Sequence, residues 1–352
     1  MHIFKNAGHE IIAIAPKDEH TQKIIDNGFQ YIEVKGLARK GTNPLRDLGL
    51  VLELRSIYKS AKLDAVIQYT IKPNIYGTFA AKLSGVKAIC TISGLGHVFY
   101  NSGISNFIAK NLYWMAFLFS DKFFIQNEDD FNLFFKSYVS PGKKAAMIMG
   151  SGIDTQYYSP VYCADKQPKE AHFPTFIMIA RLLMDKGVYE YAETAKTIKS
   201  KYPNARFLLL GDIDEDSHAT INPSDLAEWK QQGYIQHLGF VKETRPFICE
   251  ADAVVLPSYR EGIPRVILEG LSMGKPCITT DAPGCRQTVT DGVNGFICKT
   301  ANAASLTAAC QKFIELNLEQ RTEMGLSARN TALNTFDLKI IAEKYLFTVK
   351  EL

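Results

Sequence analysis

Two glutamates, Glu261 and Glu269, flank a loop that joins an apolar run to a helical pattern. The apolar run ends at Leu256, and the loop leads into a helix predicted over Arg265–Met273. Free backbone N–H groups at the start of such a helix favour hydroxyls or an anion, and nearby carboxylates can accept hydrogen bonds from sugar or ribose hydroxyls. The alternative is that Glu269 is a solvated helix residue and Glu261 an electrostatic cap of the helix.

Two cations follow a second apolar run. Arg181 and Lys186 lie in a loop that closes at Gly187. The planar fork of arginine and the mobile point charge of lysine together suit a diphosphate. The alternative is a pair of surface cations that flank a turn.

A third apolar run ends in Gly211-Asp212, where glycine would allow a ligand to approach the backbone closely. The spacing Asp212-Ile-Asp214 could also hold a metal ion, but this interpretation is disfavoured because two cations already serve the phosphates. The sequence therefore predicts no metal site and no cofactor.

Short β-rich runs alternate with helical patterns in both halves of the chain, which is typical of βαβ units on parallel sheets. We expect an α/β protein with two Rossmann-like, doubly wound domains that face each other across a cleft. The predicted domains are residues 1–160, residues 161–335 and a closing helix within residues 336–352. In open sheets of this kind ligands bind beyond the carboxyl ends of the strands. Strands are predicted at Ile11–Ala15, Tyr31–Val34, Ala65–Tyr69, Ala88–Ile92, Lys122–Gln126, Ala146–Met149, Thr175–Ile179, Ala205–Leu210, Ile235–Leu238, Ala253–Leu256, Pro276–Thr279 and Gly295–Cys298.

The composition of the 352 residues is that of an ordinary globular protein, with 46% hydrophobic and 22% charged residues and a net charge of +3. This small charge excludes a strongly polybasic nucleic-acid binder. The seven cysteines are scattered and odd in number, so we expect neither a disulfide framework nor a zinc site. A reducing cytoplasm fits this pattern better. The apolar stretch Leu112–Phe119 is too short to span a membrane and is expected to form a buried helix or to touch a membrane surface.

The ordered set R-x4-K-G, G-D and P-S-Y-x-E-G-x-P-x4-E resembles the retaining glycosyltransferases of family four, especially bacterial members that extend lipid-linked oligosaccharides. Weaker matches cover the first half of the chain. They are Arg39-Lys-Gly-Thr-Asn-Pro44, Ile71-Lys-Pro-Asn-Ile-Tyr-Gly77, Thr91-Ile-Ser-Gly-Leu-Gly96, Gln126-Asn-Glu128 and Gly150-Ser-Gly-Ile-Asp154.

The resemblance implies a role for each matching residue. Arg181 and Lys186 would hold the donor diphosphate, and Glu261 would bind a hydroxyl of the transferred sugar, which makes these three the candidate catalytic residues. Glu269 would bind the ribose of the nucleotide. Further donor-binding positions would be Gly211, Asp212, Val241, Gly262, Ile263 and Pro264. The acceptor-side positions would be Lys72, Asn74, Gly94, Gly96 and His97, with His97 a weak candidate for a general base.

The start of the chain departs from the family pattern. Ala7-Gly-His-Glu10, which in the family follows a first strand, a glycine-rich loop and a helix, comes here almost at once. We therefore expect a truncated N-terminus in which the first strand of the sheet is missing. That strand would be central, so the strands at Ile11–Ala15 and Ala65–Tyr69 would lack the neighbour that joins them.

The sequence thus predicts a transfer of sugar from a nucleotide donor, expected to be UDP-linked, to a polyprenyl-diphosphate saccharide or another glycolipid. The enzyme would be cytoplasmic, with peripheral contact to the inner face of the cell membrane. Two alternatives remain open: a sugar-nucleotide epimerase of the same architecture, and an inactive fragment that only binds nucleotide.

Overall fold

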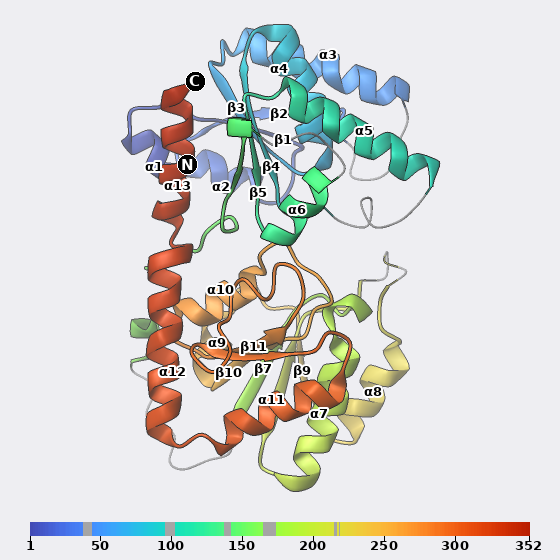
Figure 1. Cartoon of the computed structure of the whole chain (residues 1–352), viewed down its shortest axis with the longest axis vertical. Coiled ribbons are helices and arrows are strands. Elements are labelled where there is room, and N and C mark those ends of the chain that lie inside the picture. Colours follow the sequence, from blue (N-terminus) through green and yellow to red (C-terminus); the bar gives the residue numbers. More distant parts are fainter. Residues whose placement is uncertain (38–43, 96–102, 137–141, 165–173, 215–216, 218) are drawn as a thin grey trace. The chain divides into compact units, whose positions relative to one another are not determined.

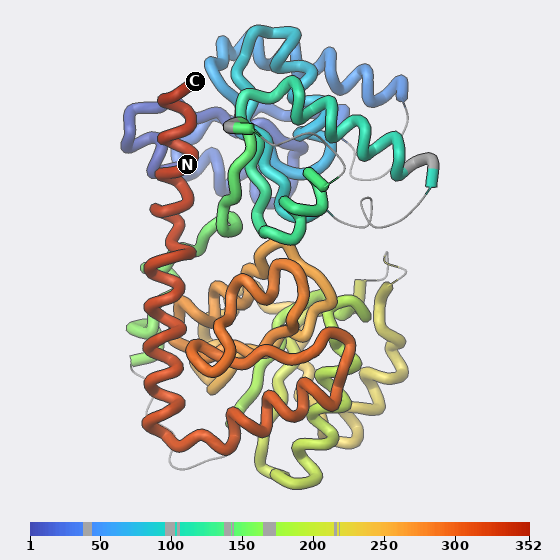
Figure 2. Tube along the Cα trace, viewed as in Figure 1, coloured from blue at the N-terminus to red at the C-terminus, as the bar shows by residue number. Residues whose placement is uncertain are grey.

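The computed structural model describes residues 1–37, 44–95, 103–136, 142–164, 174–214, 217 and 219–352 (Figures 1 and 2). The chain forms two compact units, Met1–Ile148 with Ile341–Leu352, and Met149–Ile340. The sequence-based boundary at residue 160 was placed too late. Residues 149–160 belong to the second unit because the backbone of Ile153 bonds to Phe336 and Leu338, with N···O distances of 2.8 and 2.9 Å.

The second unit is built on a six-stranded parallel sheet with the order β12-β11-β10-β7-β8-β9. The chain therefore runs outward from β7 in one direction and then returns to the other side of β7 with β10. All six strands lie within one residue of their predicted bounds, and three keep both bounds, because most of them are apolar runs of the kind that a parallel sheet buries on both faces. The strands are β7 (Thr175–Ile179), β8 (Arg206–Leu210), β9 (Gln236–Gly239), β10 (Ala253–Leu256), β11 (Cys277–Thr280) and β12 (Gly295–Cys298).

Helices cover this sheet. Gly270 allows α10 to pack closely on β10, since a Cβ at Gly270 would lie 2.7 Å from Cγ2 of Val254. Helices α7 and α11 pack against each other and are joined by a hydrogen bond between the hydroxyls of Thr307 and Thr194, with an O···O distance of 3.1 Å (Figure 1). The helices and helical turns are η4 (Pro160–Cys163), η5 (Met184–Lys186), α7 (Val188–Lys201), α8 (Pro223–Gln231), α9 (Arg245–Glu250), α10 (Arg265–Ser272), α11 (Ala303–Glu315), α12 (Leu318–Thr331) and η6 (Ala332–Phe336).

The first unit contains two parallel sheets. One has the order β3-β4-β5-β6 and the other pairs β1 with β2. In the described residues no ladder joins β1 to β3, as expected from the sequence for these two strands. The strands are β1 (Ile12–Ala15), β2 (Gln30–Glu33), β3 (Ala65–Tyr69), β4 (Lys87–Ile92), β5 (Lys122–Ile125) and β6 (Ala145–Met147).

The C-terminal helix α13 (Leu338–Glu351) ends in the first unit. Tyr345 is buried there, and its hydroxyl lies 2.8 Å from the hydroxyl of Thr91 on β4. The remaining helices of this unit are α1 (His2–Asn6), α2 (Thr21–Asp26), α3 (Pro44–Ser60), η1 (Pro73–Gly77), α4 (Thr78–Ser84), α5 (Ile104–Phe119), α6 (Glu128–Lys136) and η3 (Gly142–Lys144).

Helix α5 carries the apolar stretch that the sequence analysis singled out, and only part of it is buried. Tyr113, Ala116 and Phe117 join the core of the first unit. Phe107 and Leu118 are among the large apolar side chains that α5 exposes. No helix in the described part of the chain is long and apolar enough to cross a membrane.

One expectation about the cysteines is wrong. Cys163 on η4 and Cys249 on α9 form a disulfide, with their Cα atoms 5.5 Å apart and a sequence separation of 86. The scattered spacing gave no sign of this pair, because only the fold brings the two segments together. The other five cysteines are buried free thiols.

Candidate active site

The order of the second sheet directs attention to the carboxyl ends of β7 and β10. These two strands are neighbours, but the chain runs away from them in opposite directions, which makes this the topological switch point where α/β sheets bind ligands. The loop after β7 carries Arg181 and Lys186, and the loop after β10 carries Glu261. The residues predicted from two separate motifs thus come from adjacent strand ends.

Lys186 and Glu261 form an ion pair. The Lys186 Nζ lies 2.6 Å from Oε1 of Glu261, and each side chain is only 18% exposed. The hydroxyl of Ser258 donates a second hydrogen bond to the same oxygen at 2.8 Å. Both partners use Oε1, so the second carboxylate oxygen, Oε2, takes no part in these two contacts.

The loop that carries Glu261 is backed by the loop after β11. The Glu261 N–H donates to the carbonyl of Pro283 at 3.0 Å. Gly284 has a φ of +81°, and a Cβ there would lie 2.3 Å from the carbonyl oxygen of Glu261 and 2.2 Å from that of Gly262. Only glycine fits this approach, so Gly284 fixes the position of the Glu261 backbone.

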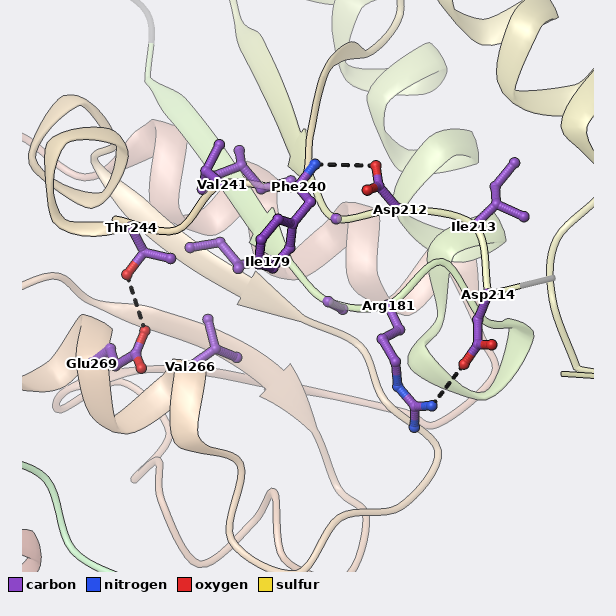
Figure 3. Close-up of a pocket in the computed structure, with 13 residues that line it drawn as sticks. Ile179, Arg181, Asp212, Ile213, Asp214, Phe240, Val241, Thr244, Val266 and Glu269 are labelled. Atoms are coloured by element: carbon purple, nitrogen blue, oxygen red, sulfur yellow. Dashed lines mark hydrogen bonds and ion pairs between the residues drawn. The ribbon is translucent and has the colours of Figure 1, made fainter. Parts of the chain in front are cut away.

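A pocket of about 800 Å³ opens beside these loops (Figure 3). Its lining includes the predicted donor-binding residues Arg181, Gly211, Asp212, Val241 and Glu269. The other predicted positions, Lys186, Glu261, Gly262, Ile263 and Pro264, lie on the loops just described and are not part of this lining. A volume of this size is in the range of small-ligand sites.

Backbone contacts shape the pocket. Gly211 has a φ of +127°, and a Cβ there would lie 1.9 Å from the carbonyl oxygen of Ala180, so the β7 and β8 loops touch through backbone alone. Asp212 Oδ1 accepts a hydrogen bond from the N–H of Phe240 at 3.0 Å, which fixes the loop after β9 (Figure 3). Phe240 is a largely exposed aromatic side chain at this edge, a suitable surface for a nucleotide base.

Glu269 lies inside the pocket on α10, where it is 8% exposed. Its Oε1 lies 3.2 Å from Nε of Arg265, and its Oε2 accepts from the hydroxyl of Thr244 at 3.4 Å (Figure 3). Burial raises the pKa of Glu269, and the positive charge of Arg265 opposes this rise. Glu269 is therefore not a solvated helix residue, and its role toward a ligand stays a prediction.

Arg181 is turned toward a partner that the sequence analysis did not assign to it. Its Nη1 lies 2.8 Å from Oδ2 of Asp214, with the Arg181 side chain 66% exposed and that of Asp214 26% exposed (Figure 3). In this arrangement a carboxylate occupies the guanidinium that the resemblance assigns to the donor diphosphate. The role of Arg181 stays a prediction.

The acceptor-side predictions fall in the first unit. Lys72 Nζ lies 3.1 Å from Oδ1 of the buried Asp47, whose Oδ2 accepts from the Tyr76 hydroxyl at 2.8 Å. Asn74 is fully buried, and its amide bonds to both the N–H and the carbonyl of Thr91. A direct contact between Asn74 and an acceptor would require these bonds to open.

Gly94 lies in the loop after β4, whereas Gly96 and His97 lie outside the described residues. The acceptor-side roles of these three positions stay predictions. In the described part of the chain, no three His, Cys, Asp or Glu side chains gather in a way that could hold a metal ion.

Sequence reasoning missed several side chains that support the site. Ser258 and Thr244 were not singled out although each bonds to one of the two predicted glutamates. The signal for Ser258 was present, because it stands three residues before Glu261 at the end of the same strand. Thr244 and Asp214 gave no such signal, since their partners are 25 and 33 residues away in sequence.

Comparison with known proteins agrees with this geometry. The family model described as glycosyl transferases group 1 matches residues 173–315, and the model described as glycosyl transferase 4-like matches residues 1–127. A Campylobacter jejuni protein, N,N'-diacetylbacillosaminyl-diphospho-undecaprenol alpha-1,3-N-acetylgalactosaminyltransferase, is 30% identical, with 97% of this chain and 91% of that protein covered. An Escherichia coli UDP-Gal:alpha-D-GlcNAc-diphosphoundecaprenol alpha-1,3-galactosyltransferase is 26% identical, covering 96% and 87%.

Solved structures share the fold. A glycosyltransferase from Rickettsia africae superposes with a TM-score of 0.80 at 22% identity, over 99% of this chain and 92% of that one. The Anabaena protein HepE, in complex with UDP and glucose, gives a TM-score of 0.77 at 20% identity, over 97% and 92%. With two parallel α/β units and a relative that matches along nearly its whole length, the chain belongs to the GT-B glycosyltransferases of the group 1 and 4-like family.

Proposed function

We propose that this protein transfers a sugar from a UDP-sugar to a saccharide linked to a polyprenyl diphosphate, with retention of anomeric configuration and without a metal or other cofactor. The observation that carries the proposal is the Lys186–Glu261 ion pair at the switch point of the second sheet, beside a pocket of nucleotide size. The names of the C. jejuni and E. coli relatives, both of which act on diphospho-undecaprenol-linked sugars, support the class of acceptor. The HepE complex with UDP supports the class of donor.

Different residues would bind different parts of the donor. The ribose hydroxyls would bond to the carboxylate of Glu269, which is already oriented by Thr244 and Arg265. The base would lie against Phe240 and Val241 after β9. The diphosphate would bridge Arg181 and Lys186 after β7, and a hydroxyl of the transferred sugar would bond to Glu261.

The chemistry follows from where charge develops. As the bond between the anomeric carbon and the β-phosphate oxygen breaks, the sugar gains oxocarbenium character and the phosphate gains negative charge. Lys186 and Arg181 stabilise that negative charge, and preorganised charges of this kind lower a barrier most when they need no rearrangement. Lys186 meets this condition because Glu261 and its loop already hold it in place.

The acceptor hydroxyl then attacks the anomeric carbon from the face that the phosphate leaves. Its proton passes to the departing phosphate oxygen, so that one C–O bond forms as the other breaks and no protein base is required. Glu261 and Glu269 therefore act on hydroxyls and not as the acid and nucleophile of a glycosidase.

The acceptor would be reached at a membrane surface on its cytoplasmic side. Helix α5 exposes Phe107, Ile108 and Leu118, and Lys110 lies on the same helix. Exposed apolar side chains beside a basic residue are the features of interfacial helices that bind anionic lipid surfaces. We propose α5 as the segment that contacts the membrane.

The proposal is tested by incubating the protein with UDP-GalNAc, UDP-Gal or UDP-GlcNAc and a short-chain prenyl-diphosphate-linked N-acetylhexosamine, followed by mass spectrometry of the acceptor. We expect one donor to add a single sugar mass and to release UDP. Lys186→Ala should abolish the product, whereas Lys196→Ala, which removes an exposed lysine on α7, should not. An epimerised or hydrolysed donor with no gain of acceptor mass from any combination would reject the proposed function.

A further inference from the structure

Two backbone contacts join the loop after β7 to the loop after β10, and they flank Lys186. On one side of Lys186, the carbonyl of Asp185 accepts a hydrogen bond from the N–H of Tyr259 at 2.8 Å. On the other side, Gly187 has a φ of +75°, and a Cβ there would lie 2.3 Å from the carbonyl oxygen of Pro257. The backbone on both sides of Lys186 is therefore fixed against the loop that leads to Glu261.

The side chain of Tyr259 adds a third link, to the helix that follows Lys186. Its hydroxyl donates to Oε1 of Glu190, in the first turn of α7, with an O···O distance of 2.6 Å. Burial, the bond to Glu190 and the negative charges of Glu190 and Asp185 raise the pKa of Tyr259 to about 12. The hydroxyl therefore keeps its proton near neutral pH and stays the donor in this bond.

Glu190 depends on this one contact. In the described part of the chain, the Tyr259 hydroxyl is the only hydrogen-bond partner of the Glu190 side chain, whose Oε2 is buried without one. Removal of the hydroxyl would leave a carboxylate with a buried oxygen and no donor, which is costly. The bond thus contributes to holding α7 and the loop after β10 together.

We propose that Tyr259 and Glu190 are positioning residues for sugar transfer, whose hydrogen bond holds the two loops together and so keeps Lys186 in place beside Glu261. This inference rests on the proposed function. Neither Tyr259 nor Glu190 belongs to the lining of the donor pocket, so both act through the residues they position.

The flexibility of lysine explains why such support matters. Its four-carbon stem can bring the ammonium to a bound diphosphate from several backbone positions, so ground-state binding tolerates a small shift of the loop. Stabilisation of the charge that develops on the leaving phosphate requires a charge that is already in place. Looser loops should therefore reduce kcat much more than the affinity for UDP.

The same helix offers a matched control. Tyr189 directly precedes Glu190, and its hydroxyl donates to Oδ2 of Asp225 on α8 at 2.8 Å. This is also a bond between a tyrosine and a carboxylate, but it joins α7 to α8 and not the two loops of the site. Tyr189→Phe therefore removes a comparable bond without loosening Lys186.

The first test compares kcat and UDP affinity in Tyr259→Phe, Glu190→Ala and the control Tyr189→Phe. Tyr259→Phe and Glu190→Ala should each lower kcat about tenfold or more, because a misplacement of about 1 Å can cost a hundredfold in rate. Their UDP affinity should stay within about threefold of wild type, and Tyr189→Phe should keep kcat within about twofold. Equal losses of kcat in the two tyrosine variants would assign the effect to stability alone and overturn the inference.

A double variant and a conservative variant test whether the two residues act as one unit. Tyr259→Phe combined with Glu190→Ala should lose no more kcat than either single change, because both remove the same bond. Glu190→Gln keeps an oxygen that can accept from Tyr259, and it should recover most of the kcat that Glu190→Ala loses. Additive losses, or a Glu190→Gln variant as slow as Glu190→Ala, would contradict the proposed bond.

A labelling experiment separates this inference from the proposed function, because it needs no substrate. The full chain is treated with a trace of acetic anhydride, and mass spectrometry measures acetylation of Lys186 relative to Lys196, an exposed lysine on α7. Tyr259→Phe should raise the relative reactivity of Lys186 about threefold or more, since looser loops open its ion pair more often, and Tyr189→Phe should not. Unchanged reactivity of Lys186 in Tyr259→Phe would overturn the inference. Failure of wild type to use any acceptor would reject only the proposed function.

Discussion

The ion pair between Arg181 and Asp214 makes a quantitative prediction about donor affinity. If Arg181 binds the donor diphosphate, its contact with Asp214 must be broken or weakened when UDP binds. Arg181 is 66% exposed, so the pair is of the solvent-screened kind, which contributes about 0.2–1 kcal/mol. Asp214→Asn removes this competition, and it should therefore tighten UDP binding by roughly 1.4-fold to fivefold.

Isothermal titration calorimetry at low salt measures this change, because screening by salt would reduce it. The matched control is Glu228→Gln, which removes an exposed negative charge on α8 outside the pocket. Asp214→Asn should bind UDP more tightly than this control, and the difference should shrink at high salt. Unchanged or weaker binding relative to the control would show that Asp214 does not compete with the phosphates, and the reasoning would fail.

Four other changes test separate parts of the site. Gly284→Ala places an alanine with a left-handed backbone against the carbonyls of Glu261 and Gly262, at a cost of roughly 1–2 kcal/mol before any clash. The value of kcat/KM should therefore fall at least about tenfold with little change in UDP affinity. Normal steady-state kinetics would contradict this. Glu261→Gln should lower kcat about a hundredfold or more while UDP still binds, and parallel loss of UDP affinity would place Glu261 on the nucleotide. The raised pKa of Glu269 means that its carboxylate begins to protonate at a higher pH than an ordinary glutamate, so donor affinity should fall earlier as pH decreases. The Glu269→Gln variant should bind UDP weakly, and its UDP affinity should not change over the same pH range. Phe107→Asp should reduce cosedimentation with anionic vesicles without changing UDP affinity, and unchanged sedimentation would remove α5 as the membrane contact.

The fold was predictable from the sequence because its strands are local apolar runs. Thr175–Ile179 and Ala253–Leu256 have the predicted ranges, since each is a continuous apolar segment bounded by loop residues. The donor-site motifs were predictable for a related reason. Each one directly follows such a strand, and parallel strands bring their carboxyl ends to one edge.

The partners of those motifs were not predictable in the same way. The Arg181–Asp214 pair and the Thr244–Glu269 bond join residues from different strand ends, and only the order of the sheet brings them together. The same holds for the disulfide between Cys163 and Cys249, whose pairing depends on how η4 packs against α9. Side-chain choices among several nearby partners are decided by packing, which single-sequence patterns do not encode.

The most direct test of the donor-site account is the proton NMR spectrum of the glycolipid formed by wild-type protein from a UDP-sugar. The account predicts a new anomeric proton whose coupling shows the same configuration as in the donor, and no such signal from Lys186→Ala. A product with the opposite configuration, or an undiminished signal from Lys186→Ala, would contradict it.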